Sequence, residues 1–387
     1  MKRTFKTVDY DQALDLTVRL GDCLPPDHLA RFVVDSVAQL DLSALYAHYG
    51  QRGGEPYAPE VLLGLLLYGY AIGIFSTRKI ERATYETVPF RFIAGNLHPD
   101  HDTLATFRHT FLQELQDLFV QVLMLAQEAG VLKLGTISLD GTKMHADASK
   151  RKAVSYKRLL EYEERMAQRA ERERTTGRRP GGRPPTPPTS EPRDGDQDNF
   201  TDPESRIMKN PTNAGFEQDY NAQVAVDQVS LLIVGCALSN HPNDSQEAEP
   251  TLGAIPLAIG TPEAAALDAG YFGPATLGAC ARRGIEPYIA TGRDPHHPSW
   301  QQRFAPLPDP PPENASAQVK MASKLKTGLG KAIYGARKCT VEPVIGIIKE
   351  VLGFRQFSLR GAQAADGEWS LVCLAFNLKR FHTLSWA

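Results

Sequence analysis

Two aspartates and one glutamate stand where they could hold divalent cations. Asp140 ends the apolar run TISLD, Asp268 ends the apolar run AAALD, and Glu342 follows in a stretch with helical spacing. Hard cations such as Mg²⁺ prefer carboxylate oxygens, and two ions about 4 Å apart can activate water and stabilise a leaving oxygen in phosphoryl transfer. A single Asp at a strand end is more often a turn or helix cap. Three converging carboxylates could supply a two-metal site.

A lysine follows the glutamate at a spacing that suits a helix. Lys349 lies seven residues after Glu342, about two helical turns, so both side chains would face the same way. A cation at this position could reach a phosphate group. Pro343 predicts that Glu342 sits near the start of its helix, because proline is tolerated in a first turn and not in the interior.

The elements before residue 130 are predicted to be helical. Apolar residues recur three and four apart in the segments 27–49, 59–74 and 103–130. Pro59 suits the first turn of the second segment, and Asp102 or Thr103 could cap the third. The pattern predicts an all-helical domain over residues 1–130.

The elements after residue 130 alternate between strands and helices. TISLDG reads as a short strand with Asp140 at its carboxyl end, and YNAQVAVD and SLLIVGCALS form an antiparallel hairpin. A strand ending at Asp268, a helix over ATLGACARRG and a strand at PYIAT follow, and the chain is helical from about Ala322. The expected fold class is α/β with an all-α N-terminal domain, the second domain covering residues 131–387.

Three segments are expected to lie outside the core. The charged stretch 150–174 has the spacing of a long solvated helix. The proline-rich stretches at about 175–200 and 293–321 cannot offset chain entropy by burial and are expected to be extended insertions.

Bulk composition limits the class of protein. The 387 residues, 42% hydrophobic, suffice for two or three domains. A formal net charge of -2 means that contacts with a polyanion would depend on local basic clusters. Five scattered cysteines argue against a disulfide framework or zinc knuckle and favour a reducing cytosol. We expect no signal peptide and no membrane span.

Three sequence blocks carry a family resemblance. LDGTKMHADAS, LDAGYFGPATL and KCTVEPVIGIIKEVLGF resemble, in this order, the catalytic blocks of bacterial insertion-sequence DDE transposases. The resemblance extends through YAPEVLLGLLLYGYAIGIFSTRKIERA and HPDHDTLATFRHTF in the helical part, and through DPESRIMKNPTNAGFEQDYNAQVAVD. It covers most of the chain apart from the two proline-rich insertions.

The resemblance implies a fold and a metal site. The second domain would be a ribonuclease-H-like mixed sheet flanked by helices, in which Asp140, Asp268 and Glu342 bind two Mg²⁺ or Mn²⁺ ions. The first domain would serve DNA binding and assembly, with the region of Arg78, Lys79 and Arg82 as a candidate contact.

The resemblance also implies DNA-binding residues near the glutamate. The family motif runs Tyr, two residues, Arg, three residues, Glu, six residues, Lys, and Tyr334, Arg337, Glu342 and Lys349 nearly reproduce it. Here four residues separate Arg337 from Glu342. Either Tyr334 and Arg337 lie just before the helix, or Lys338 takes the place of the arginine.

Other candidate DNA contacts come from side-chain type. Lys150, Arg151 and Lys152 could contact phosphates, although a solvated helix face explains them equally well. Tyr271 could stack on an unpaired base or simply pack in the core. His145 is interpreted as an ordinary polar contact.

These features lead to one functional hypothesis and two alternatives. The chain would bind the terminal inverted repeats of a mobile element, cut the DNA and join the freed 3′ hydroxyl to target DNA, as at least a dimer, without a membrane, in the bacterial cytoplasm near the nucleoid. The alternatives are a nuclease without strand transfer and a catalytically silent DNA-binding descendant. The presence of all three carboxylates weighs against the silent descendant.

Overall fold

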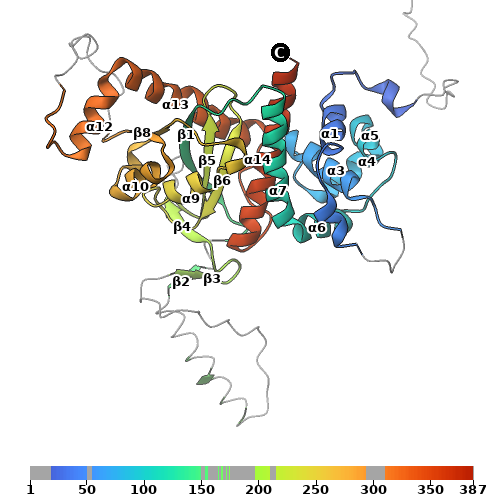
Figure 1. Ribbon diagram of the computed structural model, residues 1–387. Coiled ribbons are helices and arrows are strands. Elements are labelled where there is room, and N and C mark those ends of the chain that lie inside the picture. The colour runs from blue at the N-terminus through green and yellow to red at the C-terminus, as the bar shows by residue number, and fades with distance from the viewer. Residues whose placement is uncertain are drawn as a thin grey trace, which may run out of the picture.

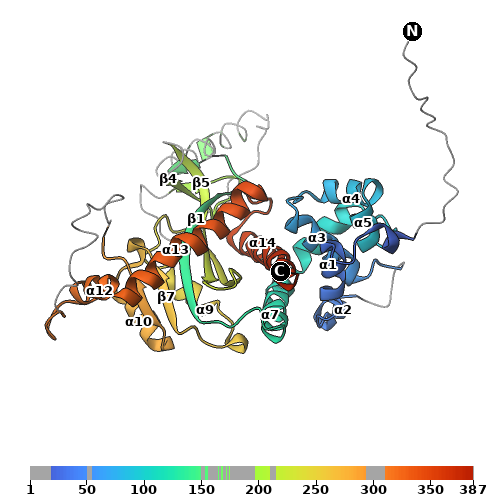
Figure 2. The same ribbon diagram turned by 90° about the horizontal axis from the view of Figure 1, so that it is seen from above.

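The computed structural model describes residues 19–49, 55–149, 153–155, 164, 167–168, 171, 174, 197–209, 215–292 and 310–386. It is a mixed α/β protein, which agrees with the α/β part of the expected class (Figure 1). The helices of the first third lie on one side and the sheet on the other, with two long helices, α7 and α14, between them (Figures 1 and 2). The ribonuclease-H-like identity and the domain boundaries stay predictions.

The described residues before Thr136 form helices and no strand. In chain order these are η1 (Leu20–Cys23), α1 (Leu29–Val37), α2 (Ser43–Ala47), α3 (Pro59–Ala71), α4 (Thr77–Glu86), α5 (Val88–Ile93), α6 (His101–Thr110) and α7 (Leu112–Glu128). Pro59 lies in the first turn of α3, as predicted. The segment 103–130 is two helices rather than one, and the cap of α6 is Asp100, whose side chain accepts from the Thr103 N–H.

A six-stranded mixed sheet forms the centre of the second part. Its strands are β1 (Thr136–His145), β4 (Arg206–Lys209), β5 (Phe216–Asp227), β6 (Ile233–Ser239), β7 (Ala264–Leu267) and β8 (Glu286–Ile289). The order is β4-β5-β1-β7-β8, with β6 paired to β5. The pairs β1–β7 and β7–β8 are parallel and the others antiparallel, which confirms the predicted hairpin of β5 and β6. Two short strands, β2 (Ala153–Ser155) and β3 (Gln197–Asn199), pair separately.

Helices cover both faces of the sheet. They are α9 (Ala248–Gly253), α10 (Pro274–Arg283), α12 (Ala317–Lys326), α13 (Gly328–Gly346) and α14 (Ala362–Ser385), with short turns η3 (Leu257–Ile259), η4 (Ala269–Tyr271) and the π-helical η5 (Ile347–Val351). Helix α13 lies across β1, β5, β7 and β8 (Figure 2). Its Thr340 hydroxyl donates to Ser138 of β1, which fixes the face on which α13 lies.

Helix α14 joins the two parts of the molecule. Its side chains are buried over most of its length, and it contacts α3, α7 and β6. Glu368 of α14 is fully buried and accepts from the Tyr70 hydroxyl at 3.1 Å, and Arg108 Nη1 lies 3.5 Å from the same carboxylate. Because a buried charge needs a partner, this contact ties α3 and α6 to α14.

The structure corrects two sequence predictions about the acidic residues. Strand β1 continues to His145 because residues 137–145 pair with 227–219 of β5, so Asp140 lies mid-strand rather than at the end. Pro343 lies inside α13 near its last turn, so Glu342 is near the end of that helix and not its start. An interior proline costs about 3 kcal/mol. Burial of Val341 and Val344 on the same helix offsets this cost.

Candidate active site

Strand register places two of the aspartates side by side. In the parallel pair β1–β7, Thr136 lies opposite Ala264 and Ser138 opposite Ala266. Two residues further in the same register are Asp140 and Asp268. Asp140 Oδ1 accepts from the Gly141 N–H at 3.0 Å, and Asp268 Oδ1 accepts from the Gly270 N–H at 2.8 Å. The backbone just after each aspartate therefore holds one of its carboxylate oxygens.

One guanidinium contacts all three predicted carboxylates. Arg337 Nη2 lies 3.3 Å from Asp140 Oδ2 and 3.7 Å from Asp268 Oδ2. Arg337 Nη1 lies 3.1 Å from Glu342 Oε1. Side chains separated by up to 202 positions in the chain, from 140 to 342, thus meet at a single buried arginine.

The three carboxylates differ in their exposure to solvent. The exposed fractions of the side chains are 17% for Asp140, 36% for Asp268 and 49% for Glu342. Burial raises the pKa of Asp140 to about 7, an effect that Arg337 opposes and that Asp268 and Asp244 increase. The three carboxylates together can carry more negative charge than the single guanidinium of Arg337 neutralises.

The donor set has the chemistry of a hard-cation site. All three side chains offer carboxylate oxygens, which suit Mg²⁺ or Mn²⁺ better than a soft metal. Within the described part of the chain, no three His, Cys, Asp or Glu side chains already stand in metal-binding geometry. Arg337 stands among the carboxylates in this arrangement. The three carboxylates therefore fit Mg²⁺ or Mn²⁺ as ligands. In this structure the guanidinium of Arg337 balances part of their negative charge.

The structure decides between the two interpretations of the shifted motif. Tyr334 and Arg337 both lie on α13, so the interpretation that they precede the helix is wrong. Lys338 is exposed, whereas Arg337 is buried against the carboxylates. Positions five apart are about 140° apart around a helix, and the long Arg337 side chain spans this difference. Arg337, and not Lys338, is the cation beside Glu342.

Lys349 lies on the same side of β1 as Asp140. It belongs to η5 and donates to Thr142 Oγ1 at 2.9 Å and to the Lys143 carbonyl at 2.8 Å. Thr142 is two residues after Asp140, and side chains two apart on a strand share a face. Burial lowers the pKa of Lys349.

The remaining predicted residues fall into three situations. Tyr271 is fully buried and its hydroxyl donates to Gln223 Oε1, so the packing role holds and the ring presents no face to a base. His145 Nδ1 lies 2.7 Å from Asp219 Oδ1, which is the polar contact expected for it. The predicted DNA contacts Lys150, Arg151 and Lys152 lie outside the described residues, as do positions 175–196 and 293–309 of the insertions.

Sequence analysis missed a fourth acidic residue close to the group. Asp244 lies in the polar segment between β6 and α9, and its Oδ1 accepts from Asn221 Nδ2 and Gln223 Nε2, both at 2.8 Å. Its only sequence signal is that it follows the end of an apolar strand, the same signal that marked Asp140 and Asp268. The residues SNHPN that precede Asp244 have the composition of an ordinary loop, so there was no reason in the sequence to single out this aspartate.

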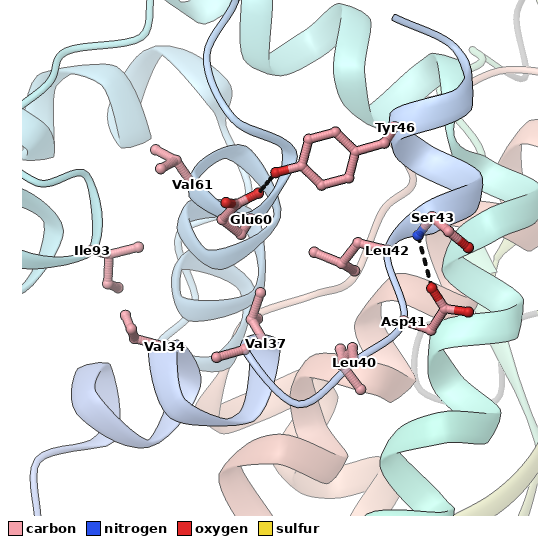
Figure 3. A pocket seen from close by; sticks show the side chains of 11 residues that line it. Val34, Val37, Leu40, Asp41, Leu42, Ser43, Tyr46, Glu60, Val61 and Ile93 are labelled. Carbon is pink, nitrogen blue, oxygen red and sulfur yellow. Dashed lines mark hydrogen bonds between the residues drawn. The ribbon is translucent and has the colours of Figure 1, made fainter.

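A pocket in the helical part is separate from these residues. It encloses about 500 Å³ and is lined mainly by apolar side chains of α1, α3 and the turn between α1 and α2, including Val37, Leu42 and Val61 (Figure 3). The Tyr46 hydroxyl donates to Glu60 at 2.5 Å at its rim. The pocket contains none of the predicted site residues, and it lacks the charged groups of the carboxylate cluster.

Comparison with protein families finds two transposase domains in the chain. Residues 18–110 match the family described as Transposase domain (DUF772), and residues 311–382 match the family described as Transposase DDE domain. Both matches are to transposase domains, and together they support an insertion-sequence DDE transposase. The second match includes Arg337, Glu342 and Lys349 of this transposase, whereas Asp140 and Asp268 lie outside both matches.

Two further findings accompany the family assignment. No curated protein matches this transposase. Among the described residues, none of the helices is both long and apolar enough to span a bilayer.

Proposed function

We propose that this transposase cuts DNA at the ends of its mobile element and joins the freed 3′ ends to target DNA at Asp140, Asp268 and Glu342. The observation that carries the proposal is the contact of all three carboxylates with the single guanidinium of Arg337. Such a cluster has no evident structural purpose between the central strands of the sheet and α13, and it matches the donor chemistry of polynucleotidyl transfer.

The sheet supports a ribonuclease-H-like core. Strand β1 lies between antiparallel β5 and parallel β7, and the two aspartates occupy neighbouring positions on the parallel pair. Glu342 comes from α13, which packs across the same strands. Two rigid strands and one helix thus position the acidic residues, which is the support that a catalytic group needs.

Each side chain has a proposed part in the chemistry. Asp140, Asp268 and Glu342 would hold two Mg²⁺ or Mn²⁺ ions, which when bound stabilise the charge that develops at the phosphorus. Arg337 would limit carboxylate repulsion, and Lys349, anchored on the Asp140 side of β1, would contact the DNA backbone. We infer no covalent protein–DNA intermediate.

Helix α4 is the proposed contact of the helical part with the element ends. Arg78, Lys79 and Arg82 are exposed on it, while Ile80 and Ala83 pack inward. Cations on one face of a helix give phosphate binding that weakens steeply with salt. Because two element ends must be held together, we propose that the DNA-bound form is a homodimer acting in the bacterial cytoplasm.

The test uses end-labelled element DNA, a target plasmid and Mg²⁺ or Mn²⁺. Wild-type protein should yield cut ends and joined products. Asp140→Asn and Asp268→Asn should reduce both by more than the roughly 10- to 100-fold typical of outer-shell changes, while repeat binding in a mobility-shift assay is retained. Asp117→Asn, an exposed acid on α7, is the control.

The outcomes separate the alternatives. Full cleavage by either site variant would refute the carboxylate assignment. Cut ends without joined products would identify a nuclease without strand transfer. Repeat binding without any cleavage by the wild-type protein would identify a silent DNA-binding descendant.

A further inference from the structure

Two buried amides hold the carboxylate of Asp244 in place. Asn221 and Gln223 are fully buried and alternate along β5, so their side chains lie on one face of the sheet. Both donate to the same oxygen, Asp244 Oδ1, at 2.8 Å. Gln223 also accepts the hydroxyl of Tyr271, which follows Asp268 by three residues. Two donors to one oxygen fix the carboxylate as an acceptor in a set orientation.

The Asp244 carboxylate lies against the backbone that follows each of the two site aspartates. A Cβ atom on Gly141, next to Asp140, would stand only 2.7 Å from Asp244 Oδ1. A Cβ atom on Gly270, two residues after Asp268, would stand 3.7 Å from Asp244 Oδ2. Glycine at position 141 therefore permits the approach of Asp244, and the second carboxylate oxygen lies on the Asp268 side.

Buried polar atoms without partners lie beside this carboxylate. Asn221 is fully buried, and its Oδ1 has no hydrogen-bond partner although its Nδ2 contacts Asp244. Lys143 pairs with Asn221 across β1 and β5, and its buried Nζ also has no hydrogen-bond partner. Buried polar groups in native proteins normally have a partner. Because an ammonium has no lone pair to offer a cation, only the Asn221 oxygen of these two atoms could serve as a ligand next to Asp244.

We propose that Asp244 is a fourth acidic residue of the divalent-cation group, positioned by Asn221 and Gln223. The inference rests on the proposed function of Asp140, Asp268 and Glu342. Asp244 adds a further carboxylate to this group, held in place by two side chains of β5. Its contribution is to the retention and placement of Mg²⁺ or Mn²⁺.

The experiment measures Mn²⁺ affinity of the full chain by calorimetry and by the electron paramagnetic resonance signal of free Mn²⁺. Asp244→Asn should weaken binding by about 10-fold or more. Asp244→Glu, which restores the charge, should recover part of the loss. Glu249→Gln removes a carboxylate on α9 that pairs instead with Arg282 and Arg283, and it should bind Mn²⁺ like the wild type.

A second arm separates this inference from the proposed function. If Asp140→Asn weakens Mn²⁺ binding and Asp244→Asn does not, the role of Asp244 is overturned and the proposed site stands. If Asp140→Asn leaves Mn²⁺ binding unchanged, the proposed site itself is overturned. Melting temperature in chelator checks that each variant is folded. Should Asp244→Asn be unfolded, Asp244→Ser, whose hydroxyl still accepts from the amides, takes its place with the same expected loss.

Discussion

Arg337 and Glu342 lie five residues apart on α13, and their side chains meet at 3.1 Å. The same guanidinium reaches Asp140 and Asp268 on the sheet. The helix therefore brings both an acid and its counter-charge to the strand aspartates. In the absence of ions, Arg337 is the main cation that limits repulsion among the three carboxylates.

Removing this arginine should destabilise the ion-free protein. Arg337→Gln should lower the free energy of unfolding by about 2 kcal/mol, less than for a fully buried pair because Asp268 and Glu342 are partly exposed. Urea unfolding in chelator measures the loss, and added Mn²⁺ should reduce it. Lys338→Gln, on the exposed neighbour, should change stability by less than about 0.5 kcal/mol. Equal losses of unfolding free energy in the Arg337→Gln and Lys338→Gln variants would contradict the role of Arg337 as the counter-charge of the three carboxylates.

Substitution of Gly141 should disturb the site without touching a carboxylate. An added Cβ would stand 2.2 Å from Gln223 Nε2 and 2.7 Å from Asp244 Oδ1, so neighbouring groups must shift. Gly141→Ala should cost about 1–3 kcal/mol and reduce cleavage. Gly335→Ala on α13 meets nothing within 4 Å and should be neutral or slightly stabilising. A stable, active Gly141→Ala protein would show that the approach of Asp244 is looser than described.

The buried acid of α14 should be among the most sensitive positions for stability. Glu368 is fully buried and also accepts from the backbone N–H groups of Ser358 and Leu359 at 2.8 and 3.0 Å. Glu368→Ala leaves Arg108 buried without its charge partner and should cost about 3–5 kcal/mol in chemical denaturation. Glu86→Ala breaks only an exposed pair with Arg82 and should cost less than about 1 kcal/mol. A loss at Glu368 as small as that at Glu86 would argue against a buried ion pair.

The pair of His145 and Asp219 should make stability depend on pH. The hydrogen bond with Asp219 raises the pKa of His145, burial opposes the rise, Glu217 adds to it and Lys349 counteracts it. Because the folded pKa exceeds the unfolded one, the stabilisation is fully present below pH 6.5 and is lost as pH rises through the folded value. The difference between wild type and His145→Gln, measured by thermal melts from pH 5.5 to 9, should therefore shrink with rising pH. A difference that grows would reverse the sign argued here.

Local patterns in the sequence predicted the elements but not their extents. Alternating apolar residues identified the β5–β6 hairpin, and the apolar runs located Asp140 and Asp268. The length of β1 could not be predicted, because it depends on pairing with β5 about 80 residues later. The division of segment 103–130 at Phe111 has no proline or glycine to mark it.

The residues of the candidate site could likewise be predicted from local sequence patterns, whereas the contacts between them could not. Its three acids were found from strand ends and motif blocks, and the structure brings them to one guanidinium. Arg337 was expected to contact DNA, since helical spacing alone did not show that its side chain could bend toward Glu342. Asp244 was missed because its neighbours Asn221 and Gln223 come from a strand whose inward face is polar, which a pattern of apolar alternation does not reveal.

The burial of α14 between the sheet and the helices α3 and α7 has a consequence for how the protein is made. During synthesis, the helical third leaves the ribosome long before residues 362–385 do. Its apolar surface against α14 then stays open to solvent and to other chains until α14 has been synthesised. A fragment that stops after α7 would expose that surface permanently, so the helical third should dissolve and fold well only as part of the finished polypeptide.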